Sequence, residues 1–505
     1  MIKLIRYGSI RFIFWAILLF AISISGLRYA LSELDLYKAD IEALLSQQLD
    51  APVTISRVQG VINGFQPELA LHDIQVYSRV DNTPTVQFQE IRLGINLLAA
   101  IEPFIEAIQV SIIKAKLSVA RLPSGAIQIE GLPNSDNEQP DWIMRGKQYK
   151  LINSEIVWHD QKRNADPVLL KHVNIALYND EEQHKIFIKT DLPESLGKSL
   201  SLAMDFTGNI FVPESINARL FAQGQDIQLA KFITGDLPFD FSFTQGTGNF
   251  NLWSRWQATK MTQISGSINL NNTVIKGQKK KLFPVDQLAL QFKLQKHQQQ
   301  WHLALQDSTL SSQKNTVEIN QLALALERDT EGNLIHLALN CPQLILRPLS
   351  KLILSYKILA ADLHKQLKSI ALQGEVKNLL LLSNPSQKTF AISGQVQQIK
   401  SRRIGEIPGI DGLSAYFKGT EQQGLIQLSS QQLNFDAPNL FRETLNFNHV
   451  LGEIHWQHAD TWTLSSTLLE LNSNHFKTSS KFTLTLPQGD QPAFMSLRNS
   501  FDIPD

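Results

Sequence analysis

The chain has 505 residues, 43% of them hydrophobic, so it is long enough to bury a large core. Its 47 basic and 47 acidic residues cancel, and a net charge of zero argues against nucleic acid as a partner. The single cysteine, Cys341, excludes an internal disulfide and is compatible with any compartment, including a periplasm.

An apolar run without any charge covers residues 12–27. As a helix it would span about 24 Å, slightly less than a hydrocarbon core of about 30 Å, and the flanking Arg11 and Arg28 can snorkel to the interfaces. Basic residues precede the run, and acidic residues follow soon after Arg28. The positive-inside rule therefore places Met1 in the cytoplasm.

We predict a cytoplasmic stub and a single transmembrane anchor over residues 1–31, and a soluble body over residues 32–505. The apolar side chains of the anchor include Phe12, Trp15, Leu18, Phe20 and Ile24. A cleaved signal peptide is the alternative, because the small residues Ser23 and Ser25 precede Gly26. We favour the anchor because the run continues into a second helical pattern without a polar break.

That second pattern has apolar residues at helical spacing, at Leu34, Ile41, Leu45 and Leu49, and Pro52 ends it. We expect this helix to pack against the first strands. From residue 53 onward short strand patterns dominate, with a helical bridge expected at 97–101 and a long exposed loop at 132–142. A short helix within 226–234 would turn Leu229 and its apolar neighbours inward.

Two neighbouring segments alternate most cleanly between apolar and polar residues. The apolar positions are Leu288, Leu290, Phe292 and Leu294 in the first segment, and Trp301, Leu303 and Leu305 in the second. A period of two predicts half-buried antiparallel strands, and the polar residues 296–300 form the hairpin between them. Residues 350–368 are the one convincing helix of the body, with an apolar face that runs from Leu352 to Leu367.

Roughly twenty strand segments therefore share about three helices, which predicts a mainly β protein. So few helices cannot cover the apolar face of so long a sheet. The sheet must close on itself, pack on another sheet or bind something apolar. A dry sandwich or barrel and an open trough both satisfy the pattern, and the alternation alone does not choose between them.

Two groups of motifs resemble the YhdP type of the AsmA-like envelope proteins of Gram-negative bacteria. The first comprises Leu36-Tyr37, Ile41-Glu42, Leu49, Pro52-Val53-Thr54-Ile55, Gly64-Phe65, Pro67-Glu68-Leu69-Ala70-Leu71 and Asp73-Ile74. The second comprises Ile407-Pro408-Gly409-Ile410, Gly412-Leu413-Ser414, Gly424-Leu425-Ile426-Gln427-Leu428, Pro438, Leu440-Phe441-Arg442-Glu443, Gly452-Glu453-Ile454 and Trp456. The order and spacing of these motifs carry the resemblance, and they cover most of the chain.

The resemblance implies an elongated, curled antiparallel β-sheet with an open groove, held at the inner membrane with its body in the periplasm. It also implies a lipid conduit that moves phospholipid between the inner and outer membranes and so maintains the outer-membrane permeability barrier. Its partners would be the inner membrane, phospholipid acyl chains and outer-membrane or other envelope proteins. Members of this type are usually more than twice as long as this chain, so we expect either a fragment or a form without the distal half.

Within this interpretation, the seven apolar residues from Leu288 to Leu305 are the candidates for the lipid groove. The alternative is a periplasmic scaffold or assembly factor with a dry β core and no lipid cargo. Finding one continuous open cavity, or lipid bound to the body, would favour the conduit over the scaffold.

We expect no enzyme activity, cofactor or metal. The sequence contains neither a Gly-x-Ser-x-Gly elbow nor a phosphate-binding loop, and Gly246-Thr247-Gly248 is predicted to be a turn. Ser111 and Ser195 each precede a lysine at Ser-x-x-Lys spacing, which we interpret as chance.

Three histidines and a run of three lysines have plain structural explanations as well as functional ones. His449, His455 and His458 resemble a metal cluster, but His455 and His458 would point to opposite faces of one strand. The run Lys279-Lys280-Lys281 is either a solvated loop or a contact for anionic headgroups.

Overall fold

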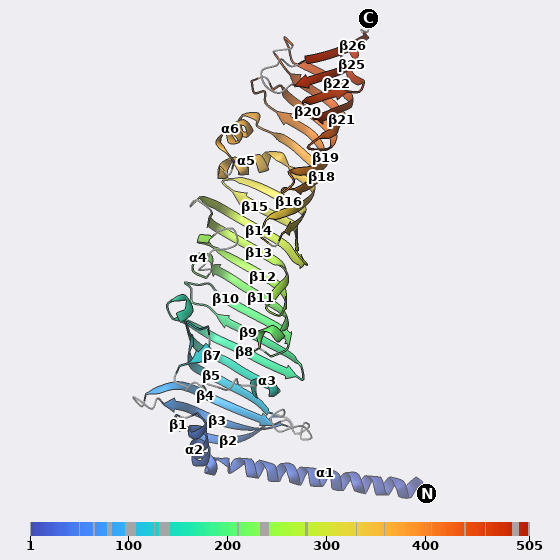
Figure 1. Cartoon of the computed structure of the whole chain (residues 1–505). Coiled ribbons are helices and arrows are strands. Elements are labelled where there is room, and N and C mark those ends of the chain that lie inside the picture. Colours follow the sequence, from blue (N-terminus) through green and yellow to red (C-terminus); the bar gives the residue numbers. More distant parts are fainter. Residues whose placement is uncertain are drawn as a thin grey trace. The chain divides into compact units, whose positions relative to one another are not determined.

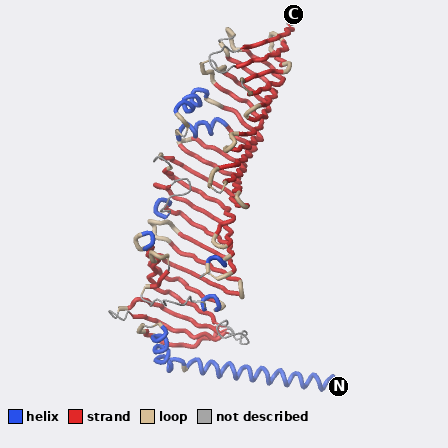
Figure 2. The backbone as a smooth tube through the Cα atoms, in the orientation of Figure 1, coloured by secondary structure: helices blue, strands red, loops and turns tan. Residues whose placement is uncertain are grey.

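The computed structural model describes residues 2–49, 51–63, 66–77, 83–95, 108–125, 127–130, 142–209, 212–232, 242–277, 281–329, 331–357, 359–405, 407–438, 441–459, 461–486 and 494–502. Strands make up most of these residues and helices are few (Figure 1, Figure 2). The mainly β fold predicted from the sequence is therefore confirmed.

The chain divides into two compact units. The first comprises Met1–Ile227 with Arg255–Lys260, and the second comprises Gln228–Ser254 with Met261–Asp505. The boundary predicted at residue 31 remains a prediction.

The first unit contains α1 (Ile2–Ser32), η1 (Leu34–Tyr37), α2 (Lys38–Gln48), β1 (Val53–Thr54), β2 (Arg57–Asn63), β3 (Gln66–Tyr77), β4 (Pro84–Ile95), β5 (Ile108–Arg121), β6 (Ile127–Ile129), α3 (Trp142–Arg145), β7 (Gln148–Asp160), η4 (Gln161–Arg163), β8 (Val168–Asp180), β9 (Gln183–Asp191), β10 (Ser199–Thr207), η5 (Pro213–Ser215) and β11 (Asn217–Gln228). β1 and β2 both pair with β3, and β3, β4 and β5 follow side by side. From β7 to β11 each strand is antiparallel to the next.

The pairing of β5 with β7 is parallel and corrects the prediction of a purely antiparallel sheet. Gln109 lies opposite Gln148 at one end of this pair, and Arg121 lies opposite Asp160 at the other. A parallel neighbour needs a crossover of a dozen residues or more, and the segment 122–147 provides one. β6 lies in this segment and pairs with the end of β5. The sheet of the first unit is therefore mixed.

The second unit contains α4 (Leu229–Phe232), β12 (Ser242–Gln257), β13 (Lys260–Lys276), β14 (Leu282–His297), β15 (Gln300–Ser312), β16 (Asn315–Arg328), β17 (Leu334–Ile345), α5 (Leu346–Tyr356), α6 (Ala361–Ile370), β18 (Gln373–Asn384), β19 (Thr389–Ser401), β20 (Gly409–Thr420), β21 (Gln423–Asp436), β22 (Leu445–His458), β23 (Trp462–Ser466), β24 (Leu469–Asn472), β25 (Lys477–Leu486) and β26 (Phe494–Asp502). β13 to β22 form an antiparallel meander in chain order. β23 and β24 both pair with β22 and with β25, and β26 pairs with β25.

β-Bulges interrupt many of these strands near their middle. The register shifts in β15 around Asp307, and further shifts affect β7, β8, β18 and β19. Asp307 and Asn153 in β7 have positive φ angles, the conformation of a residue added at a bulge. A bulge bends its strand and increases the local twist, so these positions curl the sheet within each unit.

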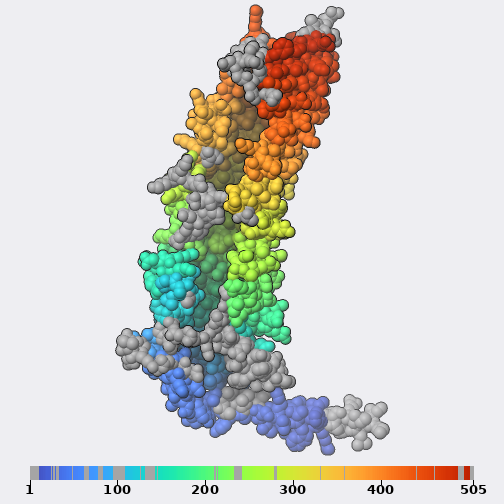
Figure 3. Space-filling view, viewed as in Figure 1, coloured from blue at the N-terminus to red at the C-terminus, as the bar shows by residue number. Residues whose placement is uncertain are grey.

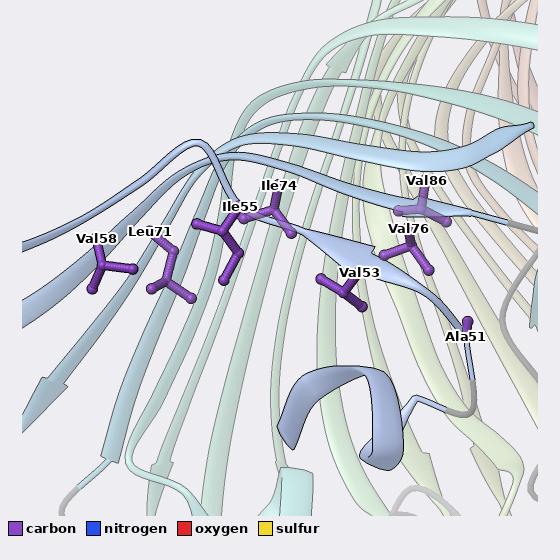
Figure 4. Close-up of a cluster of buried hydrophobic side chains, with 8 residues drawn as sticks. All are labelled: Ala51, Val53, Ile55, Val58, Leu71, Ile74, Val76 and Val86. Atoms are coloured by element: carbon purple, nitrogen blue, oxygen red, sulfur yellow. The ribbon is translucent and has the colours of Figure 1, made fainter. Parts of the chain in front are cut away.

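The helix predicted after the apolar run is confirmed in outline. It begins as η1 and continues as α2, and Leu34, Ile41, Leu45 and Leu49 pack against a core cluster on the first strands. That cluster comprises Ala51, Val53, Ile55, Val58, Leu71, Ile74, Val76 and Val86 (Figure 4). Polar side chains of the helical segment join it to β1 and β2, since Ser46 Oγ accepts from Val53 N and Asp35 Oδ1 accepts from Val58 N, both at 2.9 Å.

The apolar run predicted as an anchor lies in α1, which is one uninterrupted helix. Phe12 is 75% exposed, and Trp15 and Phe20 are also exposed. Leu18 is partly buried, and the side chain of Ile24 lies outside the described residues. A search of the described residues finds no helix with the length and apolar content required to cross a membrane. The transmembrane span remains a prediction.

Two local predictions were wrong. The single helix expected at 350–368 is two helices, because the chain turns at Lys357 in the left-handed conformation with a φ of 49° after α5. Gly246 and Gly248, predicted to form a turn, lie within β12. A side chain at Gly246 would collide with Thr273, so this glycine permits a close approach of β12 to β13.

Other predicted segments have mixed outcomes. The bridge expected at 97–101 and residues 132–141 of the expected loop lie outside the described residues, whereas Trp142 begins α3. The short helix expected within 226–234 is the single turn α4, and its Leu229 is buried as predicted.

Candidate functional site

The seven apolar groove candidates lie on β14 and β15 in the second unit, on one face of the sheet. Phe292 lies opposite Leu305, and Leu294 lies opposite Leu303. Leu288 and Leu290 continue the same face of β14, opposite Leu270 and Ile268 of β13. Trp301 is two residues from Leu303 on β15, so its side chain points to this face as well.

The face extends well beyond these two strands. The register places one row of aliphatic side chains directly opposite each other on seven consecutive strands, β13 to β19. Its members are Ile264, Leu294, Leu303, Leu324, Leu339, Leu381 and Ile392. We call this row the aliphatic ladder. It is an apolar surface that runs across the strands, and every member of it is partly buried rather than buried.

The opposite face of β14 and β15 is more polar and more exposed. Gln291 and Lys293 of β14 are exposed, and Gln306 and Asp307 mark the same exposed side near the bulge of β15. Small residues such as Ala304 and Ala325 occupy part of this side. The contrast between the faces identifies the side with the aliphatic ladder as the one that avoids water.

No second protein layer accounts for the burial of the ladder in the described part of the second unit. The main contacts of β14 and β15 are with neighbouring strands, and α5 contacts β16 and β18. Figure 3 shows a hollowed face between the strand ends of the second unit. Much of the apolar face that carries the aliphatic ladder is therefore available to a ligand.

The row continues past β19 with a change of composition. Ile392 lies opposite Gly419, Gly419 opposite Gly424, and Gly424 opposite Trp456. A side chain at either glycine would collide with the indole of Trp456, so the ring lies across β20 and β21 where the glycines leave space. Leu464 of β23 lies opposite Trp456, so the next position in the row is aliphatic again.

The helix α5 closes one edge of this face, at the first residues of β14, β16 and β18. Asn315 Nδ2 donates to Pro348 O at 2.7 Å, and Tyr356 Oη donates to Pro284 O at 2.9 Å. Burial raises the pKa of the Tyr356 hydroxyl above its usual value, so this donor stays protonated at neutral pH. Two polar contacts thus fix α5 beside the apolar face.

Cys341 belongs to the same face as Leu339, two residues along β17. It is a buried free cysteine that lies opposite Leu379. Burial raises the pKa of its thiol, which keeps it protonated and unreactive.

The residues weighed as catalytic or metal-binding candidates are dispersed. Ser111 pairs with Arg92 and Lys150 inside the sheet of the first unit, and Ser195 is exposed in a turn. In the second unit, His458 stacks on Trp462 with ring centroids 4.4 Å apart, and His455 Nε2 lies 3.5 Å from Glu453. No group of metal-ligating side chains is found among the described residues.

Sequence reasoning missed the length of the aliphatic ladder and the place of Trp456 within it. The alternation in β16 and β17 is as regular as in β14, so Leu324 and Leu339 could have been found by the same pattern, whereas Leu381 lies in a run of four leucines that does not show which face it belongs to. The register that aligns these residues is set by the turns between successive strands, and alternation within a single strand does not give it. Neither could the sequence show that Gly419 and Gly424 face each other.

A comparison with protein-family models finds one match, to the family described as YhdP protein, over residues 1–505. Comparisons with curated proteins and with solved structures find no match. The sequence resemblance stated above therefore agrees with a family match that covers the whole chain.

Proposed function

We propose, for a chain that belongs to the YhdP family, that it is a lipid conduit of the cell envelope. In this proposal the apolar face of the second unit holds phospholipid acyl chains on their way between the inner and outer membranes. Such transport would maintain the permeability barrier of the outer membrane. The aliphatic ladder is the observation that carries the proposal.

The ladder supports acyl chains as the ligand for a physical reason. Apolar burial is non-directional and contributes about 25 cal/mol per Å², so a chain of methylenes gains free energy at any position along a uniform aliphatic row. Because the described residues place no second protein layer over this partly buried row, its apolar surface remains available for such a gain. A ligand that is long, flexible and apolar fits this surface better than a compact polar one.

We further propose that α1 holds the protein at the inner membrane, with Met1 in the cytoplasm and the body in the periplasm. The exposed Phe12, Trp15 and Phe20 support this placement, since they have no protein cover on a helix that begins at Ile2. Envelope proteins at the outer membrane would be further partners. No catalytic step is required of the chain.

The proposal is tested by placing a charged side chain on the apolar face. Leu290→Asp would leave an open face hydrated and folded but would repel acyl chains, because an ion in a hydrocarbon environment costs several kcal/mol. Gln291→Asp on the exposed side of the same strand is the matched control. Protein abundance, thermal melting and outer-membrane permeability to a large antibiotic would be measured for both variants.

We expect Leu290→Asp to accumulate and melt normally while permeability rises, and Gln291→Asp to behave as wild type. Loss of the Leu290→Asp protein would instead favour the scaffold with a dry core, because the carboxylate would then be buried without a partner. Normal protein with normal permeability would show that this face does not carry lipid.

A further inference from the structure

The helical pair α5 and α6 carries an excess of positive charge in a chain whose net charge is zero. Residues 346–371 contain five cations and a single carboxylate, Asp362. The cations are Arg347, Lys351, Lys357, Lys365 and Lys368, and all five are exposed. Within the described ranges none of them takes part in an ion pair.

Two other segments add cations to the same place. Lys281 Nζ donates to the Lys357 carbonyl at 2.9 Å, which brings the end of the predicted basic run to the end of α5. Arg402 N donates to Ile370 O at 2.7 Å, which places Arg402 and the exposed Arg403 at the end of α6. Three segments that are far apart in the sequence therefore supply one basic surface, which we call the basic cap.

The two helices of the basic cap are held differently. α5 is fixed to the sheet by its buried Leu352 and by the hydrogen bond from Tyr356 to Pro284. α6 packs on α5, and its Leu363 is 54% exposed. A short helix with exposed lysines beside an exposed leucine has the amphipathic composition of a lipid-contacting surface.

The basic cap lies at the edge of the apolar face. Asn315, which contacts α5, begins β16. Val317 follows two residues later, opposite Leu310, and Leu310 lies opposite Leu288 of the candidate set. From Val317 to Leu324 of the aliphatic ladder the strand covers about 23 Å, which exceeds the roughly 15 Å of one leaflet's hydrocarbon. The face is wide enough for an acyl chain that starts at the basic cap.

We propose that the basic cap binds the phosphate headgroup of a phospholipid whose acyl chains lie on the apolar face. The inference rests on the proposed function, because it assigns the polar end of the same ligand. Arginine and lysine are the side chains that bind phosphate through charge-assisted hydrogen bonds. Here they outnumber the single carboxylate of the helical pair, Asp362, and Leu363 offers an apolar contact next to them.

The experiment uses the full chain in growing cells whose lipids carry radioactive phosphate. A photo-reactive amino acid replaces Leu363 in one strain and Leu303 of the aliphatic ladder in another. Each of these two strains then receives the double substitution Lys365→Glu and Lys368→Glu in α6. The matched control receives Lys185→Glu and Lys189→Glu instead, which reverse two exposed lysines of β9. Labelled adducts are quantified and identified by mass, and melting of each variant is measured.

We expect a phospholipid adduct at Leu363 that falls about tenfold or more in the Lys365→Glu and Lys368→Glu variant, since two charges are reversed. The adduct at Leu303 should persist in that variant, and the control should not change either adduct. An adduct at Leu303 but none at Leu363 would overturn the proposal. The proposal would also be overturned if the adduct at Leu363 did not change on charge reversal, or if Leu363 formed adducts only with free phosphate or only with protein. Absence of lipid at both positions would overturn the proposed function and this inference together.

Discussion

The sheet face at β1 to β4 and the sheet face at β13 to β19 are built from similar residues but are covered differently. In the first region α2 lies on the strands, and Leu71 and Ile74 are each 2% exposed. In the second region the aliphatic ladder is only partly buried, although its residues are as apolar. Alternation therefore predicts which face of a strand is apolar but not what covers that face.

The largest effect expected from this comparison concerns truncation of one leucine in each region. Leu71→Ala should lower the free energy of unfolding by about 2–5 kcal/mol, because it leaves a cavity in a closed core. Leu303→Ala should lower it by about 1 kcal/mol, because the site is already open to solvent. Urea unfolding of the full chain, followed by tryptophan fluorescence, measures both. Equal losses would show that the second face is covered after all.

A smaller effect should appear at a buried bend of the second unit, where the register between β20 and β21 shifts. Ser430 is fully buried, its Oγ accepts from Ser414 N at 2.9 Å, and it donates to Ser414 O at 3.0 Å. Ser430→Ala leaves both backbone groups unsatisfied and should cost about 1–3 kcal/mol. Ser429→Ala, exposed on the same strand, is the control. A neutral Ser430→Ala would mean that water reaches this bend.

A pH effect should come from His184, which is buried in the first unit against the ring of Phe206. Burial lowers its pKa below the usual value, so the unfolded chain binds a proton that the folded chain resists. The contribution of His184 to the free energy of unfolding should therefore have its full value at neutral pH and decline as the pH falls below about 6.5. Melting temperature against pH should show a shallower decline for His184→Gln than for wild type. An exposed control, His475→Gln, should leave the slope unchanged.

The smallest effect is expected at the residues that resemble catalytic or metal groups. Replacing Ser111, Ser195, His455 and His458 together with alanine should leave outer-membrane permeability as in wild type. The reason is that these side chains lie apart and outside the aliphatic ladder. A leaky outer membrane, with protein abundance and melting unchanged, would contradict a function that needs only an apolar face.

Much of the strand content could be predicted from the sequence because period-two alternation is local. Leu290 and Phe292 on one face, with Gln291 between them, determine the strand and its orientation without reference to any partner. The helix over 34–49 was equally local, and its packing on β1 to β3 followed from its apolar stripe. The family resemblance added the groove, which alternation could not supply.

What could not be predicted depends on contacts between distant residues. The parallel pairing of β5 and β7 is decided by the crossover of residues 122–147, and the break at Lys357 has no glycine or proline to announce it. The alignment of Leu303 with Leu324 and Leu339 depends on the turns that set the register of each strand pair, and on one register shift beside Arg328. The basic cap is assembled by hydrogen bonds between segments that are separate in the sequence.

The most direct measurement of the central claim is photo-crosslinking along one strand of the full chain in cells. A photo-reactive residue would be placed in turn at Leu303 and Leu305 on the apolar face, and at Ala304 between them. If this face carries lipid, phospholipid adducts should form at Leu303 and Leu305 and be absent at Ala304. Adducts of equal yield at all three positions, or none at Leu303 and Leu305, would contradict the account.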